Sequence, residues 1–396
     1  MQRRSFIRGA ASSAIALAIG AVCVPAMAQD TPFKVGLLLS MTGQQASTGR
    51  QVLAGVKQYM AEHGDTVAGR KVEIIVKDDV AVPDTTKRLA QEMIVNDKVD
   101  VIAGFGVTPN AMAVAPLATQ SKTPAIIMAA ATSAITDASP FMVRASFTLP
   151  QASVTLADWA PKGGIKSVVT LVSDYGPGKD AEKYFTERFE RSGGKVIDQL
   201  RVPLMAPDFG PFLQKVHDLK PDALFVFVPS GLGAALMKQF VERGMHKGGI
   251  RLIGTGDMTD DDLLNGMGDS ALGVVTAHHY SAAHDSPTNQ KYVQAFEKAN
   301  NGMRPNFMSV GGYDGMHLIY AALEKTKGGQ GGGPALVEAM KGLSFESPRG
   351  PVQVDPQTRE LIQNVYLRKI EKKDGQLYNV EFDVAKAVKD PGKEKK

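Results

Sequence analysis

The feature that most constrains this chain is a regular alternation between short apolar runs and segments with helical spacing. Residues 33–39, 72–76, 99–103 and 125–128 are nearly continuous apolar runs, as expected for strands buried on both faces. Between them, apolar residues recur every three or four positions, which predicts helices that pack on a sheet. Strands that alternate with helices over short connections form parallel sheets with right-handed crossovers. The first part of the chain is therefore predicted to be an α/β unit.

The same alternation restarts after Pro150 and predicts a second α/β unit with its own sheet. Its strands are expected at 168–172, 196–202, 223–228, 252–254 and 274–278. Near the end, apolar stretches at 364–370 and 377–382 surround Asp374-Gly375, which favours a tight hairpin turn. The glycine-rich run at 328–333 predicts a surface turn, because no apolar strand leads into it as a phosphate loop requires.

The first 28 residues have the pattern of an export signal. They open with Arg3 and Arg4 before Phe6, continue with an apolar stretch and end in small residues at 26–28. This order is typical of a secretory signal peptide, and the paired arginines fit the twin-arginine variety; an uncleaved anchor is the alternative. Cleavage after residue 28 removes Cys23, the only cysteine, so the mature chain is predicted to contain no disulfide and no cysteine ligand.

Composition excludes several classes of protein. The chain has 45 Lys+Arg and 41 Asp+Glu, and three of its arginines lie in the leader, so the mature part is almost neutral. Such a balance does not predict nucleic-acid binding. A hydrophobic content of 43% excludes disorder, and the only long apolar run is N-terminal, which excludes a polytopic membrane protein. A length of 396 residues suggests two or three folding units.

The sequence contains no assembled catalytic constellation. A Gly-x-Ser-x-Gly elbow and a Gly-x4-Gly-Lys-Ser/Thr phosphate loop are both absent. Gly104 and Gly106 follow a predicted strand, but Thr108-Pro109-Asn110 stands where a dinucleotide fingerprint has its third glycine. We therefore expect a protein that binds its ligand without altering it and needs no cofactor.

Two clusters have the residue types of metal sites but simpler explanations. Adjacent His278 and His279 on a strand would point to opposite faces, and a third ligand would have to come from His284. We interpret them as a solvated hinge segment. The carboxylates of Asp260-Asp261-Asp262 are interpreted as a cap at the start of a helix. No metal is expected.

Small and hydroxyl-bearing residues follow the predicted strands, at the edges where the strand ends of each unit converge. In the first unit they are Thr42, Thr108, Asn110, Ala130 and Thr132. In the second unit they are Tyr175, Ser230 and Asp257. Ligands bind at this edge of parallel sheets, and free N–H groups at helix starts suit a carboxylate. Asp257 would pair with a ligand ammonium, whereas a helix-capping role is the alternative.

Four segments occur in an order and spacing that resemble a known family. They are Val35–Gly43, Lys77–Asp79, Thr123–Ile127 leading to Ala130-Ala131-Thr132, and Ser173–Gly176. Together they resemble the type I periplasmic solute-binding proteins of ABC transporters, in particular the leucine/isoleucine/valine-binding family. The similarity extends from about residue 33 to about residue 382. It implies two Rossmann-like lobes with mainly parallel sheets, joined by a three-segment hinge that closes on a ligand.

This resemblance implies a division of the chain and a set of partners. The expected parts are a signal peptide at 1–28, lobe 1 at 29–150 and 283–345, lobe 2 at 151–282 and 346–384, and a frayed polar tail at 385–396. A monomer located in the periplasm is expected, with the permease and ATPase subunits of an importer as partners.

The family's ligand contacts transfer to this chain by position. Thr108 or Asn110, with Ala130 and Thr132, should hold the ligand carboxylate. Tyr175 should cover the ligand, Asp257 lies where the family places its acid for the α-ammonium, and Phe307 lies near the side-chain pocket.

Two positions depart from the pattern of amino-acid binders and leave the ligand open. Thr48 stands where an aromatic residue is frequent, and Pro229-Ser230 stands where a tyrosine is frequent. Thr48 is also predicted to form a capping box with Gln51 at the start of a helix. The leading prediction is a branched-chain or other hydrophobic amino acid. The alternative ligand is an aromatic carboxylate such as a benzoate or phenylpropenoate. A sensing module or an exported enzyme on the same scaffold is the alternative from another class.

Overall fold

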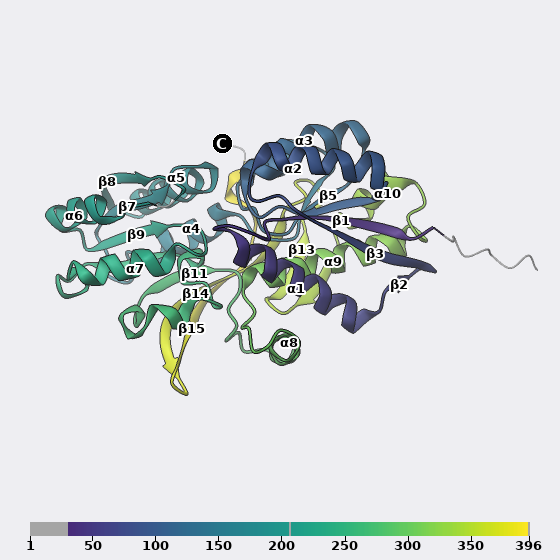
Figure 1. Cartoon of the computed structure of the whole chain (residues 1–396). Helices are drawn as coiled ribbons and strands as arrows, with labels where there is room; N and C mark the ends of the chain where they lie inside the picture. Colours follow the sequence, from purple (N-terminus) through teal and green to yellow (C-terminus); the bar gives the residue numbers. More distant parts are fainter. Residues whose placement is uncertain (1–30, 206, 395–396) are drawn as a thin grey trace, which may run out of the picture.

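A computed structural model describes residues 31–205 and 207–394, which form two lobes, each built around its own β-sheet (Figure 1). The predicted signal peptide at 1–28 lies outside the described residues. Within the two described ranges, no helix combines the length and apolarity that a membrane crossing requires.

The sheet of lobe 1 has six strands in the order β2-β3-β1-β4-β5-β6, and every neighbouring pair except β2–β3 is parallel. Its strands are β1 Phe33–Leu39, β2 Thr66–Val67, β3 Arg70–Asp78, β4 Val101–Gly104, β5 Ala125–Ile127 and β6 Met142–Arg144. The central strands are buried on both faces, as their continuous apolar runs predict.

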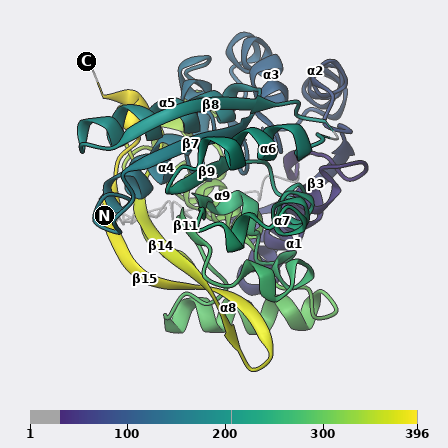
Figure 2. The same ribbon diagram turned by 90° about the vertical axis from the view of Figure 1, so that its left-hand side faces the viewer.

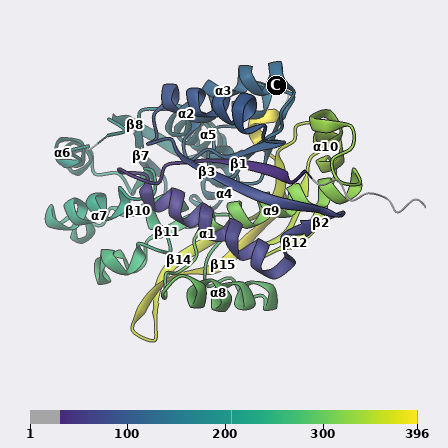
Figure 3. The same ribbon diagram turned by 45° about the vertical axis from the view of Figure 1, so that its right-hand side comes forward.

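Helices cover both faces of this sheet, with α2 and α3 on one side and α1 and α9 on the other (Figures 1 and 3). The helices of lobe 1 are α1 Ala46–His63, α2 Pro83–Glu92, α3 Thr108–Ser121, α8 Pro287–Ala299, α9 Phe307–Lys325 and α10 Gly332–Met340. Helix α1 begins at Ala46 with Gln45 as its N-cap, so the predicted capping box at Thr48 and Gln51 is wrong. Thr48 lies within the first turn, and its hydroxyl donates to Gln45 Oε1 over 3.4 Å.

The sheet of lobe 2 has nine strands, eight of them in the order β12-β13-β14-β11-β10-β9-β7-β8, while β15 pairs with β14. Strands β7 to β11 run parallel to their neighbours within that group, and β12 to β15 are antiparallel. The strands are β7 Ser167–Ser173, β8 Lys195–Val202, β9 Ala223–Phe227, β10 Arg251–Thr255, β11 Val275–His278, β12 Ser344–Ser347, β13 Gly350–Val354, β14 Leu361–Lys373 and β15 Gln376–Val388. The accompanying helices are α4 Leu149–Trp159, α5 Gly176–Arg191, α6 Gly210–Leu219 and α7 Gly233–Glu242.

The long hairpin of β14 and β15 turns at Asp374 (φ 50°) and Gly375 (φ 79°), as the Asp-Gly dipeptide predicts (Figure 2). The end of the chain differs from the expected frayed tail. Strand β15 continues to Val388, and the buried Asp390 carboxylate accepts hydrogen bonds from Ser133 Oγ (2.5 Å) and Thr148 Oγ1 (2.9 Å). We call residues 389–394 the C-terminal strap, because they tie lobe 1 to the start of α4.

The histidine and aspartate clusters also differ from expectation. His278 and His279 are fully buried, and their rings pack on Phe147 at centroid distances of 4.6 Å. The solvated hinge segment is therefore wrong, because β11 lies between β10 and β14 and is covered on both faces. The predicted helix cap at Asp260 is also wrong, because the helical turn Leu264–Met267 has Leu263 as its N-cap. The buried Asp260 carboxylate instead accepts hydrogen bonds from Ser230, from Asn306 Nδ2 (2.9 Å) and from the N–H of Asp262 (3.0 Å).

Candidate functional site

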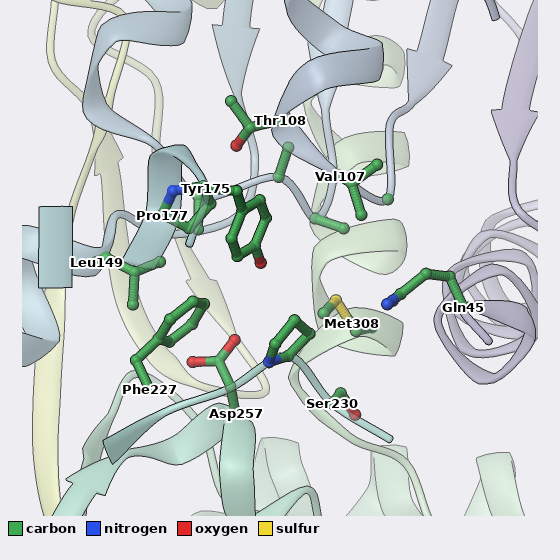
Figure 4. A pocket seen from close by; sticks show the side chains of 15 residues that line it. Gln45, Val107, Thr108, Leu149, Tyr175, Pro177, Phe227, Ser230, Asp257 and Met308 are labelled. Carbon is green, nitrogen blue, oxygen red and sulfur yellow. The ribbon is translucent and has the colours of Figure 1, made fainter. Parts of the chain in front are cut away.

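A cavity lies between the lobes, at the carboxyl ends of the parallel strands of both sheets (Figure 4). Loops that follow β4, β5, β7, β9 and β10 supply most of its wall. The lining residues are Gln45, Gly106, Val107, Thr108, Ala129, Ala130, Ala131, Leu149, Tyr175, Pro177, Phe227, Pro229, Ser230, Asp257 and Met308. This is the place where open parallel sheets bind ligands.

The part of the lobe 1 half of the cavity that follows β4 and β5 is built mostly from backbone and small side chains, and the longer side chains of Gln45 and Met308 complete this half. The chain leaves β4 through two left-handed residues, Gly104 (φ 109°) and Phe105 (φ 65°), and so brings Thr108 to the first position of α3. A Cβ atom on Gly104 would lie 2.4 Å from Leu38 O, so this turn requires glycine.

The first N–H groups of a helix have no intrahelical partner and carry a partial positive charge. Of the first three residues of α3, Thr108 is the one whose N–H is left for a ligand, because Pro109 has no N–H and the N–H of Asn110 donates to Val107 O over 3.2 Å. This half of the cavity therefore suits an anion.

The lobe 2 half of the cavity is built from large side chains. Tyr175 lies between Thr108 and a second group formed by Phe227 and Asp257 (Figure 4). The rings of Tyr175 and Phe227 are nearly parallel, 24° apart in orientation with centroids 6.0 Å apart. Pro229 adds a further flat apolar surface. Together they form a wall that suits a flat, apolar ligand body.

Asp257 is the acid of this cavity and follows β10. Thr255 Oγ1 donates to its Oδ2 over 2.9 Å, and no lysine, arginine or histidine of the described residues forms an ion pair with it. Burial raises the pKa of Asp257 to about 7, and the Thr255 hydrogen bond and the more distant Arg368 only partly oppose this effect. The carboxyl can therefore donate a hydrogen bond to a ligand when it is protonated and accept one when it is ionised.

The lobes are closed over the cavity, and several contacts join them at its rim. Gln44 Nε2 donates to Leu204 O over 3.3 Å, and Ser47 Oγ donates to Asp262 Oδ2 over 3.3 Å. At the other side of the rim, the N–H of Ser133 donates to Asp180 Oδ2 over 3.0 Å. These contacts link α1 and the 129–133 loop of lobe 1 to lobe 2.

Five of the ten predicted ligand residues line the cavity, namely Thr108, Ala130, Tyr175, Ser230 and Asp257. Two others lie directly behind the wall: Thr132 shares a hydrogen bond with Thr108 (2.9 Å between the hydroxyl oxygens), and the Thr48 methyl group lies 3.4 Å from the Cβ position of Gly106.

The remaining three are turned to other partners. Asn110 donates to Asp79 Oδ2 over 2.8 Å, Thr42 donates to Asp78 Oδ2 over 2.7 Å, and Phe307 packs against Phe147 and His278.

Sequence reasoning missed six larger side chains of the cavity: Gln45, Val107, Leu149, Pro177, Phe227 and Met308. Phe227 lies one residue before the end of the predicted strand 223–228 and ends β9, so its position was a usable signal. Leu149 and Met308 come from the starts of α4 and α9, and only the packing of the two lobes brings these helix ends to the cavity. Among the residues described in both ranges, no group of three or more His, Cys, Asp or Glu side chains is placed to hold a metal ion.

Comparison with known proteins agrees with this geometry. A family model described as "Periplasmic binding protein" matches residues 32–376, and the chain belongs to that family. More particularly, it is a solute-binding protein of the kind that serves ABC transporters. Membership of the family implies export to the periplasm.

Individual relatives cover nearly the whole described chain. A Brucella melitensis protein named Leu/Ile/Val-binding protein homolog 6 is 43% identical over 381 residues, or 95% of this chain and 97% of the relative. An ABC-transporter solute-binding protein from Rhodopseudomonas palustris BisB5, solved with 3,4-dihydroxybenzoic acid, is 61% identical with a TM-score of 0.90, covering 92% of this chain and 99% of that one. A counterpart from strain HaA2, solved with p-hydroxybenzoic acid, is 42% identical with a TM-score of 0.89 over the same shares.

Proposed function

We propose that this chain is the periplasmic receptor of an ABC importer for an aromatic carboxylate that carries a ring hydroxyl group. The ligand carboxylate would lie against the start of α3 and the 129–131 loop, and its ring would lie beside Tyr175 and Phe227. The hydroxyl group would meet Asp257 on the opposite side of the cavity.

The observation that carries this proposal is the geometry of the lobe 2 wall, where Tyr175, Phe227 and Pro229 form a flat surface with the Asp257 carboxyl beside it. An α-ammonium group would be best served by a fully ionised carboxylate, but burial raises the pKa of Asp257 to about 7. A carboxyl group at that pKa accepts a hydrogen bond from a phenolic hydroxyl without needing a cation. The flat wall made by Tyr175, Phe227 and Pro229 matches a ring better than a branched aliphatic chain. The dihydroxybenzoate and hydroxybenzoate complexes of the two Rhodopseudomonas palustris relatives support the same class.

A branched-chain amino acid is the second candidate. The name of the Brucella melitensis relative favours it, and so does the presence of an acid in the cleft, since Asp257 would gain an ammonium partner. In that case the bound ligand would draw the carboxyl into its ionised form.

Titration calorimetry with 4-hydroxybenzoate, benzoate and leucine separates the candidates. We expect 4-hydroxybenzoate to bind more tightly than benzoate, and Asp257→Ala to remove about 1–2 kcal/mol from 4-hydroxybenzoate binding alone. Preferential binding of leucine, with a loss of about 2–4 kcal/mol in Asp257→Ala, would replace the proposal by the second candidate. Asp198→Ala is the matched control, because Asp198 pairs with Lys215 outside the cavity.

The proposal also covers export, the division of the chain into lobes, the oligomeric state and the partners. Residues 1–28 would direct export, residues 29–150 and 283–345 would form most of lobe 1, and residues 151–282 with 346–384 would form most of lobe 2. The mature protein would act as a monomer that delivers its ligand to the permease and ATPase subunits and does not transform it. Turnover of 4-hydroxybenzoate by the purified protein would contradict this view.

A further inference from the structure

The loop that forms the lobe 1 edge of the cavity, residues 129–133, is supported from behind by a buried arginine. Arg144 ends β6, and no part of it is exposed to solvent. Its Nε pairs with Glu360, which is 1% exposed and also accepts a hydrogen bond from Thr136 Oγ1 over 2.6 Å. The guanidinium group is thus fixed in one orientation by a carboxylate on its far side.

The other nitrogens of Arg144 hold backbone carbonyl groups of the loop. Nη1 donates to Ala130 O, and Nη2 donates to Thr132 O over 2.7 Å. The hydroxyl of Ser146 donates to Ala130 O as well, over 3.3 Å. Two carbonyl groups of the loop are therefore drawn toward Arg144 and away from the cavity.

The hydrogen bonds from Arg144 to these two carbonyl groups also fix the direction in which the N–H groups of the same peptide units point. In a planar trans peptide, the N–H points opposite to the C=O of the same unit. The Thr132–Ser133 unit confirms the geometry, because its C=O accepts from Arg144 and its N–H donates to Asp180 on the other lobe over 3.0 Å. The Ala130–Ala131 unit is held in the same way, so the N–H of Ala131 points away from Arg144. Ala130 and Ala131 both line the cavity, and none of the described residues accepts a hydrogen bond from Ala131 N–H.

We propose that Arg144 is a positioning residue for specificity: it aims the N–H of Ala131 at a ligand carboxylate and withdraws the Ala130 carbonyl that would otherwise attract an ammonium group. The inference rests on the proposed function, because it requires an anionic ligand at this edge. It adds a reason why the cavity selects an acid without an amine. Buried N–H groups normally have a partner, and here the ligand supplies it.

The test compares Arg144→Lys with the wild-type protein. Lysine keeps the charge but has no planar fork that reaches two carbonyl groups at once. In protein labelled with ¹⁵N-alanine, the Ala131 amide proton should shift downfield when 4-hydroxybenzoate binds, and Ala131→Gly identifies its signal. In Arg144→Lys we expect this shift to disappear and the affinity for 4-hydroxybenzoate to fall about tenfold or more.

Two further variants separate positioning from general support of the fold. Arg70→Lys changes another buried lobe 1 arginine that donates to backbone carbonyls, at Thr31, Pro32 and Gly328, and should leave binding unchanged. Glu360→Gln removes the charge that fixes the arginine fork, so the Ala131 shift should become smaller and the affinity should fall with it. This variant also supplies the test if Arg144→Lys does not fold.

The outcomes distinguish the two proposals. If the wild-type protein does not bind 4-hydroxybenzoate, the proposed ligand class fails, and this inference fails with it. If the wild-type protein binds but Ala131 does not respond, or responds equally in Arg144→Lys with unchanged affinity, the inference alone is overturned. An unchanged Ala131 shift with unchanged affinity in Glu360→Gln would likewise overturn it, because the fixed orientation of Arg144 would then not matter for binding.

Discussion

The two halves of the cavity hold a ligand by different means. The lobe 1 half presents backbone N–H groups and small residues around Thr108 and Ala131, and its charge is only the partial charge of a helix start. The lobe 2 half presents Tyr175, Phe227 and a buried carboxyl at Asp257. We therefore expect the first half to recognise a functional group of the ligand, and the side chains of the second half to distinguish one ligand body from another.

The two halves also differ in how much they cost the stability of the folded chain. Backbone donors at the start of a helix are present in any case, so exposing them to a ligand costs the fold little. A buried carboxyl without an ion pair destabilises the folded chain whenever it is ionised. Specificity on the lobe 2 side is therefore obtained at a cost in stability, and the lobe 1 side carries no such cost.

The largest expected effect tests that cost. Asp257→Asn should raise the free energy of unfolding of the ligand-free protein by about 4 kcal/mol at pH 8. Burial raises the pKa of Asp257 from 3.8 to about 7 in the folded chain. Between these values the folded chain holds a proton that the unfolded chain has released, so the wild type loses stability as pH rises through about 7. The advantage of the variant should vanish near pH 4.

Denaturant titrations at pH 4, 6 and 8 measure this difference. Asp222→Asn is a control of opposite sign, because backbone hydrogen bonds from Lys166 and Ser167 lower the pKa of Asp222. The predicted cost comes from the ionised form of Asp257, so the gain in the free energy of unfolding must depend on pH. An equal gain at all three pH values would contradict the prediction that this ionised carboxyl makes the lobe 2 half costly.

The next effect concerns the contact between the halves. Gly176 begins α5, and a Cβ atom there would lie 2.9 Å from Thr132 Oγ1 and 3.5 Å from the Thr108 methyl group. Gly176→Val should hold the lobes apart and weaken ligand binding about thirty- to a hundredfold, or about 2–3 kcal/mol. Small-angle scattering should show a less compact liganded particle. Gly266→Val, where a Cβ atom meets nothing within 4 Å, is the matched control; equal affinities in both variants would contradict the prediction.

The smallest effect tests the backbone character of lobe 1. Thr108→Val keeps the shape of the side chain and removes the hydroxyl that is bonded to Thr132. The N–H of residue 108 remains, so the affinity should fall only about threefold, or less than about 1 kcal/mol. Calorimetry measures it, and abolished binding would show that lobe 1 grips its ligand through a side chain after all.

Much of the fold was predictable because its strands are buried on both faces and leave a continuous apolar signature. The strand ends also located Thr108, Tyr175 and Asp257, because parallel strands bring their carboxyl ends to one edge. The burial of His278 and His279 was not predictable in this way, since period-two alternation does not show that both faces of β11 are covered. The role of Arg144 was hidden because its partners are carbonyl groups, which every residue carries.

The C-terminal strap has a practical consequence for where a reporter or a tag is attached to this protein. Asp390 is bonded to Ser133, next to the loop that meets the ligand, and to Thr148, at the base of the second lobe. A fluorescent reporter fused behind the strap would consequently sit close to a place where the two lobes are tied together. A purification tag would be better attached at the other end of the chain, where it cannot pull on that anchor.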